Sequence, residues 1–189
     1  MQQMLCYIVQ EPPEGAESKR AFRFPFIACE IFTCEIEILL RTLVEEEELM
    51  NLLFSFLESN QLHRTLLVGY FSKVVICLLL RKTVATIRYI QAHQEILAKL
   101  VNLIGIPSIM ELLIRLVGAD NHMYTYHVDA LQWLADTNLL EMLVDALSST
   151  SCPAVHQNAA ETLCAITHLV PSALALRLFQ PKLCGKAFL

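Results

Sequence analysis

The sequence predicts an all-α protein built from antiparallel helix pairs. Apolar side chains recur at helical spacing through most of the 189 residues, which is the primary signal for amphipathic helices. No stretch alternates apolar and polar residues for long enough to build a sheet. Only 5 glycines and 7 prolines interrupt the chain, so we expect short turns between successive helices.

Each helix is predicted from its apolar spacing together with a start or stop signal. Pro12-Pro13 ends a first short segment, and Pro25 opens the next helix, where its missing N–H donor does no harm. The acidic run 45–48 suits a helix N-terminus, because negative charge is favourable there. Gly105-Ile106-Pro107 predicts a stop and a restart. The expected helices are 24–42, 49–57, 62–82, 84–93, 95–104, 108–117, 128–135, 139–147 and 154–170.

The apolar faces of two late helices indicate how the helices pack. In the helix at 139–147, only Glu141, Asp145 and Ser148 leave a narrow polar strip, so this helix must lie between neighbours. Short loops make those neighbours antiparallel. Hairpins recurring at roughly 30 to 40 residues are typical of a right-handed α-α superhelix of the armadillo or HEAT type, and a compact helical bundle is the alternative. The helix at 154–170 carries one apolar stripe, formed by Val155, Ala159, Leu163, Ile166 and Val170.

Three regions are expected along the chain. Residues 1–21 are predicted to form a short helix and a mobile polar loop, 22–178 the helical-repeat domain, and 179–189 a tail. Trp133, the single tryptophan, is interpreted as a packing anchor within the repeat domain.

Composition argues against nucleic-acid binding and membrane insertion. The net charge is −5 and no dense basic stripe exists, whereas a backbone-tracking nucleic-acid binder needs clustered Lys and Arg. The mean hydropathy of +0.48 is high, but a spanning helix needs about 20 nearly uninterrupted apolar residues. The run 66–80 contains Lys73, and the run 25–40 contains three glutamates. The N-terminus lacks the features of a secretory signal, so we expect a cytoplasmic protein, with the nucleus as a second location.

The seven cysteines are interpreted as reduced, mostly buried thiols in a reducing compartment, because most lie in apolar runs without a zinc-binding spacing. His122 and His127 lie near Asp120 and Asp129, but a spacing of five residues across a loop does not impose a metal site. We therefore expect solvated histidines there, and neither a metal nor a cofactor.

A catalytic role is the least favoured interpretation. Cys152 and His156 lie four residues apart near a predicted helix start, where the pKa of a thiol can fall. Pro153 separates them, and no Gly-rich turn follows to supply an oxyanion donor. The sequence therefore predicts a protein that is not an enzyme.

Residues suited to partner binding are concentrated along the helices at 62–82 and 84–93. Arg and Tyr are enriched at interface hot spots, and a superhelix exposes an extended concave face. For any single residue the alternative is a half-buried tyrosine or a solvated charge. Asn158 borders the stripe of its helix, where its amide could bond a partner backbone or a neighbouring turn of its own fold. The candidates are Tyr70, Lys73, Arg81, Lys82, Arg88, His93 and Asn158, with Tyr89 beside them.

Six segments resemble the SAPS domain in order along the chain. They are FRFPFIACEIFTCEI (22–36), LLVGYFSKVVICLLLRK (66–82), YIQAH (89–93), IMELLIRLVGAD (109–120), LQWLADTNLLEMLV (131–144) and VHQNAAETLCAI (155–166). SAPS proteins are regulatory subunits of a serine/threonine phosphatase, protein phosphatase six and its fungal equivalent. The resemblance implies an armadillo- or HEAT-like fold that continues beyond both ends of this chain. It further implies a scaffold that binds, modulates or targets a phosphatase catalytic subunit carrying all the metals and catalytic residues, with further scaffold proteins as additional partners. The alternative is a helical-repeat adaptor for clients other than phosphatases.

Overall fold

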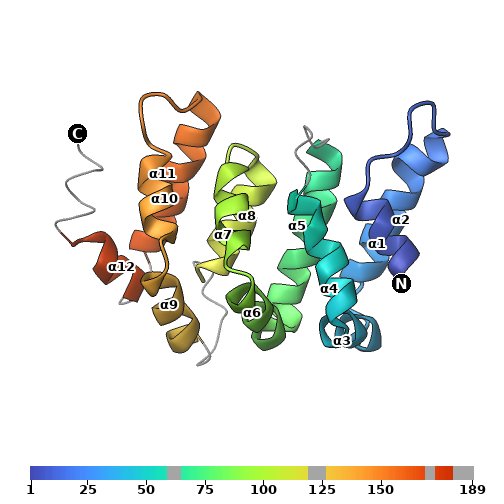
Figure 1. Ribbon diagram of the computed structural model, residues 1–189, viewed down its shortest axis with the longest axis horizontal. Helices are drawn as coiled ribbons and strands as arrows, with labels where there is room; N and C mark the ends of the chain where they lie inside the picture. Colours follow the sequence, from blue (N-terminus) through green and yellow to red (C-terminus); the bar gives the residue numbers. More distant parts are fainter. Residues whose placement is uncertain (59–64, 119–126, 169–172, 181–189) are drawn as a thin grey trace. The chain divides into compact units, whose positions relative to one another are not determined.

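The computed structural model confirms the all-α prediction for the part of the chain that it describes (Figure 1). Within that part every regular element is a helix, and no helix is long and apolar enough to cross a membrane. The chain divides into two compact units, Met1–Ile96 and Leu97–Leu189. The described residues are 1–58, 65–118, 127–168 and 173–180.

The first unit is organised around α5, its longest helix. Helix α5 packs against α2, α1 and α6, and α1 also contacts α2 and α4; in Figure 1, α1 and α2 lie beside each other at the N-terminal end of this unit. Nine residues of α5 are buried, so α5 supplies much of the unit's core. The helices are α1 (Gln2–Val9), the π-helix η1 (Lys19–Arg23), α2 (Phe24–Thr33), α3 (Glu37–Glu45), α4 (Glu47–Phe54), the 3-10 helix η2 (Ser55–Glu58), α5 (Thr65–Arg81) and α6 (Thr83–Ala92).

The single helix predicted for 24–42 is wrong, because two helices occupy this stretch. Helix α2 ends at Thr33, and Glu35 takes a positive φ of 58°, a conformation that L-residues rarely adopt. The break redirects the chain so that α3 buries Leu40 and Leu43 and packs against α4 and α6. The helix also starts earlier than predicted, because η1 continues directly into α2.

The start signals read from the sequence agree with the structure. Glu47 and Glu48 lie in the first turn of α4, as the acidic run predicts. Pro107 occupies the first turn of α8, where proline has no donor to lose. Pro153, which was not predicted as a start signal, occupies the first turn of α11 in the same way. Local signals of this kind act within one turn, so the sequence alone is sufficient to locate them.

The second unit pairs helices that are far apart in sequence. Helix α11 packs against α8, α10 and α12, and α9 packs against α12 and α10. Helix α12 was not predicted as a separate element. The helices are α7 (Glu95–Asn102), whose first turn contains the boundary between the units, α8 (Pro107–Leu116), α9 (His127–Asp136), α10 (Leu139–Asp145), α11 (Pro153–Thr167) and α12 (Ala173–Leu178).

The buried face of α11 is wider than the predicted stripe. Ala159, Leu163 and Ile166 are buried as expected, whereas Val155 is only half-buried and Val170 lies outside the described residues. The additional members are polar, Asn158 and Thr162. The turn between α7 and α8 lies close against this helix, because a Cβ built at Gly105 would come within 3.0 Å of Val155 Cγ2. Glycine therefore permits the close approach of this turn to α11.

The prediction that the cysteines are mostly buried is wrong for three of the six that the structure describes. Cys29 and Cys77 are buried, Cys6 is half-buried, and all six are free thiols. Burial raises the pKa of Cys29 to about 11 and also raises that of Cys77. An apolar run covers every face of a helix, so it does not show which positions the neighbouring helices cover. The exposed thiols are Cys34, Cys152 and Cys164.

These positions predict an order of thiol reactivity. At pH 8, Cys34 and Cys152 are expected to react with iodoacetamide at least about tenfold faster than Cys29, because alkylation requires an accessible thiolate. Peptide mapping of timed samples by mass spectrometry measures each rate separately. In urea the rates should converge. Equal rates in the folded chain would contradict the burial of Cys29 between α2 and α5.

Candidate partner-binding site

Six of the seven predicted partner-binding residues lie in the first unit, on α5, on α6 and in the turns that follow these helices. Tyr70 and Lys73 lie on the outer side of α5, Tyr70 half-buried and Lys73 exposed. They belong to a row at positions i, i+4, i+7 and i+14 that also contains Leu66 and Leu80, which is the spacing of one helix face. This face of α5 therefore presents large apolar groups with one cation among them.

Tyr70 lies where the row on α5 borders α2. The Cys29 thiol on α2 donates a weak hydrogen bond to the Tyr70 carbonyl at 3.9 Å. Partial burial raises the pKa of the Tyr70 hydroxyl, with Cys29 and Glu30 as further causes. The positive charge of Lys73 acts in turn on Cys29. Tyr70, Lys73 and Glu30 are therefore neighbours on adjoining helices.

The cations at the C-terminal end of α5 are already used within the fold. Arg81 forms an ion pair with Glu35, and Lys82 forms one with Glu37. The hydrogen bond from Lys82 lowers the pKa of Glu37, and the hydrogen bond to Glu35 raises the pKa of Arg81. Both acids flank the start of α3, so these cations help to hold the redirected α3 against the end of α5.

The lowered pKa of Glu37 predicts a pH dependence of stability. The ionised Glu37 contributes stability above its ordinary pKa of 4.5, and that contribution is lost as the pH falls through the lower pKa of the folded state. Urea midpoints at pH 7 and pH 3 should therefore differ less for Glu37→Gln than for the unchanged chain. Glu14→Gln, at an exposed position between α1 and η1, is the matched control. An identical pH response in Glu37→Gln would exclude this contribution.

Tyr89 and His93 join α6 to α4 through a stack of rings. Tyr89 stacks on Phe54 with centroids 5.1 Å apart and on His93 at 4.3 Å, and its hydroxyl donates to Asn51 Oδ1 at 2.7 Å. Burial, with the charges of Glu47 and other acids as lesser causes, raises the pKa of Tyr89 to about 12. His93 Nδ1 also lies 3.0 Å from the Tyr89 carbonyl. These contacts give both residues a structural role.

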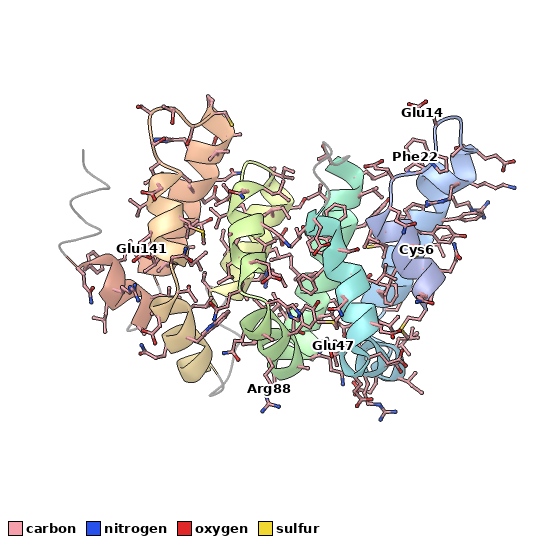
Figure 2. All side chains as sticks on the ribbon, viewed as in Figure 1. Cys6, Glu14, Phe22, Glu47, Arg88 and Glu141 are labelled. Atoms are coloured by element: carbon pink, nitrogen blue, oxygen red, sulfur yellow. The ribbon has the colours of Figure 1, made fainter. Side chains whose placement is uncertain are left out.

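Arg88 and Asn158 occupy opposite environments. Arg88 is exposed and points away from α6 (Figure 2), and the described residues include no ion-pair partner for it. Asn158 is in the second unit and only 7% exposed, and its Nδ2 donates to the Ile104 carbonyl at 2.7 Å. Of the two alternatives for Asn158, the intramolecular one is observed. Asn158 therefore does not form one site with the other six predicted residues.

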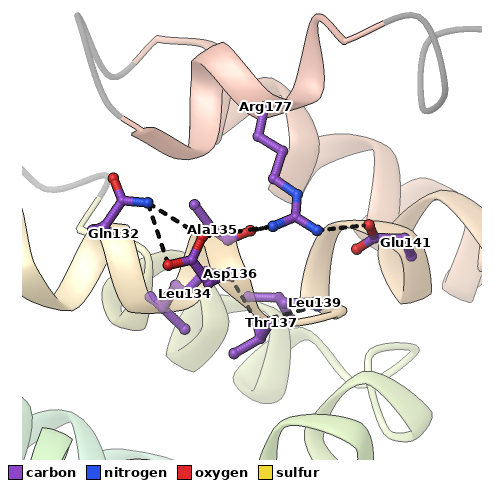
Figure 3. Close-up of polar contacts among 8 residues, drawn as sticks. All are labelled: Gln132, Leu134, Ala135, Asp136, Thr137, Leu139, Glu141 and Arg177. Carbon is purple, nitrogen blue, oxygen red and sulfur yellow. Dashed lines mark hydrogen bonds and ion pairs between the residues drawn. The ribbon is translucent and has the colours of Figure 1, made fainter.

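One polar cluster in the second unit was missed by the sequence analysis (Figure 3). Arg177 on α12 donates to the Ala135 carbonyl near the end of α9 and to Glu141 Oε1 at 3.1 Å, and it lies 3.9 Å from Asp136. A cavity of about 280 Å³ borders it, with Gln132 and Gln180 in its lining. Arg177 thereby caps α9 and fixes α12. A lone arginine within the apolar run 173–179 was the only signal for this cluster.

The described residues show no arrangement that supports the catalytic or metal-binding candidates. Cys152 and His156 are both exposed, and their contact is the helical hydrogen bond from the His156 N–H to the Cys152 carbonyl at 3.0 Å. No group of three or more His, Cys, Asp or Glu residues is arranged to hold a metal within the described ranges. His122 and Asp120, and the side chains of His127 and Asp129, lie outside what the structure describes.

Comparisons with known proteins place these features in a family context. The family model described as SIT4 phosphatase-associated protein (SAPS) matches residues 75–176. Serine/threonine-protein phosphatase 6 regulatory subunit 2 of Mus musculus is 31% identical over 169 residues, which cover 89% of this chain and 18% of the relative. Regulatory subunit 1 of Homo sapiens is 30% identical over 169 residues, covering 89% and 19%.

A fungal protein is similar over nearly the same length. Extragenic suppressor of kinetochore protein 1 of Schizosaccharomyces pombe is 28% identical over 173 residues, covering 88% of this chain and 20% of that protein. The chain therefore spans about a fifth of the length of the curated relatives that it matches. No solved structure matches it.

Proposed function

The chain belongs to the SAPS family, and on that premise we propose that it is part of a regulatory or scaffolding subunit that binds a serine/threonine protein phosphatase catalytic subunit of the phosphatase 6 type and modulates or targets its activity. The family match over residues 75–176 carries this proposal. The names of the similar proteins, regulatory subunits of serine/threonine-protein phosphatase 6, support it.

A non-catalytic role follows from the same proposal. We assign the metals and the catalytic residues to the partner, and we keep the right-handed superhelix of repeats over 22–178 as the proposed architecture. The hairpin α5–α6 and the stacking of α11 on α8 and α10 support such a repeat. The free thiols support a reducing compartment, so the cytoplasm, with the nucleus as a second location, is the proposed site of action.

Within this function, Lys73 and Tyr70 are the strongest candidates for partner contact. Lys73 is exposed and has no ion-pair partner among the described residues, so a partner can use its charge without breaking the fold. Arg81 and Lys82 are already paired with Glu35 and Glu37. Reversing either of those charges would disturb α3 as well as any interface.

The test is capture of purified phosphatase 6 catalytic subunit by the immobilised chain. We expect binding by the unchanged chain and a loss of at least about fivefold in affinity for Lys73→Glu, because removing a hot-spot group costs more than about 1 kcal/mol. Surface plasmon resonance gives both dissociation constants. Arg41→Glu, an exposed cation on α3 that is not among the predicted partner-binding residues, separates a local effect from a change in net charge.

The two negative results of the capture experiment have different meanings. No capture by the unchanged chain would remove the phosphatase proposal for this chain and favour the helical-repeat adaptor. Capture that is unaffected by Lys73→Glu would keep the function and remove Lys73 from its site.

A further inference from the structure

A second row of exposed side chains lies on α2, next to the row on α5. Arg23, Phe26, Ile27 and Glu30 fall at i, i+3, i+4 and i+7, and all four are exposed, so they share one helix face. Phe22 of η1, four residues before Phe26, is also exposed (Figure 2). Helices generally turn large apolar groups inward, and the buried face of α2 is formed by other positions, Pro25, Ala28, Cys29 and Phe32.

The two rows make one continuous surface, which we name the α2–α5 face. Helices α2 and α5 pack directly on each other, with the Cys29 thiol against the Tyr70 carbonyl. Contiguous exposed apolar patches of this kind mark interaction sites in soluble proteins. The exposed fractions of its large apolar side chains are 55% for Phe22, 50% for Phe26, 40% for Ile27, 39% for Leu66 and 43% for Leu80.

The charges on this face identify the chemistry of its partner. Arg23 and Lys73 lie within the two rows, and Lys19 lies four residues before Arg23 on η1. None of the three has an ion-pair partner among the described residues. Glu30 is the one carboxylate in the two rows. The chain as a whole carries a net charge of −5, so the excess of positive charge here is local. A partner that covers the face must bring acidic groups to these cations.

The length of the α5 row indicates the form of the partner. Leu66 and Leu80 are 14 residues apart in one helix, a span of about 21 Å at 1.5 Å per residue. A helix of about four turns laid along the face would cover the row, with apolar anchors spaced at i, i+3, i+4 and i+7. A lipid surface is less suited, because polybasic membrane sites typically carry about four to eight cations.

We propose that the α2–α5 face binds an acidic amphipathic helix of a partner protein, with Phe26, Ile27, Leu66 and Leu80 receiving its apolar anchors and Lys19, Arg23 and Lys73 pairing with its carboxylates. The proposal goes beyond phosphatase binding, because the face can receive such a helix from any client. Its failure and the failure of phosphatase capture are therefore separate results.

The test uses a display library of random 16-residue peptides on a helix-forming background. Selection on the unchanged chain, with counter-selection on the double variant Phe26→Ser/Lys73→Glu, is expected to enrich peptides with apolar residues at helical spacing flanked by Asp and Glu. For an enriched peptide, fluorescence anisotropy should give at least about fivefold weaker binding to each single variant. Binding should weaken further as salt rises.

Controls use side chains outside the face. Ile38→Ser on α3 and Arg88→Glu on α6 remove an exposed apolar group and an exposed cation of the same types, and both should bind the peptide within about twofold of the unchanged chain. Circular dichroism and melting curves verify that every variant is folded. Enrichment of basic or uncharged peptides overturns the proposal. So does a selection in which no enriched peptide binds the unchanged chain better than the double variant. Face-dependent binding to phosphatidylserine vesicles, or face-dependent self-association in sedimentation, would then identify the true occupant.

Discussion

Replacing Phe71 by alanine is expected to lower the free energy of unfolding by about 3–5 kcal/mol, the largest effect of any single substitution proposed for this chain. Phe71 on α5 is fully buried. Its ring stacks on Phe56 with centroids 4.8 Å apart and meets Phe54 edge-on at 5.9 Å. Truncation removes the contacts of α5 with α4 and η2 at once and leaves a cavity that surrounding helices cannot close.

Urea unfolding followed by circular dichroism measures this effect. Phe26→Ala is the matched control, because Phe26 has the same side chain at 50% exposure and should change the free energy by no more than about 0.5 kcal/mol. Equal losses for the two variants would show that Phe71 does not lie in the core of the first unit.

Replacing Asn158 by alanine is expected to cost about 1–3 kcal/mol in the second unit. The Asn158 amide donates to the Ile104 carbonyl at 2.7 Å and so joins α11 to the end of the α7 segment. Alanine would leave that carbonyl without this donor in a buried position, and the loss of a partner for a buried polar group is the costly case. The close approach at Gly105 leaves little room for water to replace the amide.

The fluorescence of Trp133 reports on this unit specifically, because it is the single tryptophan and lies half-buried on α9. Gln157→Ala is the matched control, an exposed amide one position earlier in the same helix. Asn158→Ala should shift the urea midpoint of the tryptophan signal and Gln157→Ala should leave it in place. An unchanged midpoint in both would return Asn158 to the candidates for partner contact.

Several features of this protein were determined by the sequence alone because they depend on residues within one or two helical turns. Apolar spacing predicts most of the helices, and Glu47 and Pro107 lie in first turns as expected. The SAPS motifs were recognisable without coordinates, since a family pattern is a property of the order of residues. The family match at 75–176 confirms that resemblance.

Other features were decided only by the tertiary structure, because they depend on neighbours far along the chain. The positive φ at Glu35 divides a stretch whose apolar pattern is continuous, and the acids that flank the break pair with cations about 45 residues later. Packing likewise places Asn158 inside the fold and leaves Lys73 outside it. Burial is a relation between helices, so a pattern within one helix does not determine which face its neighbours will cover.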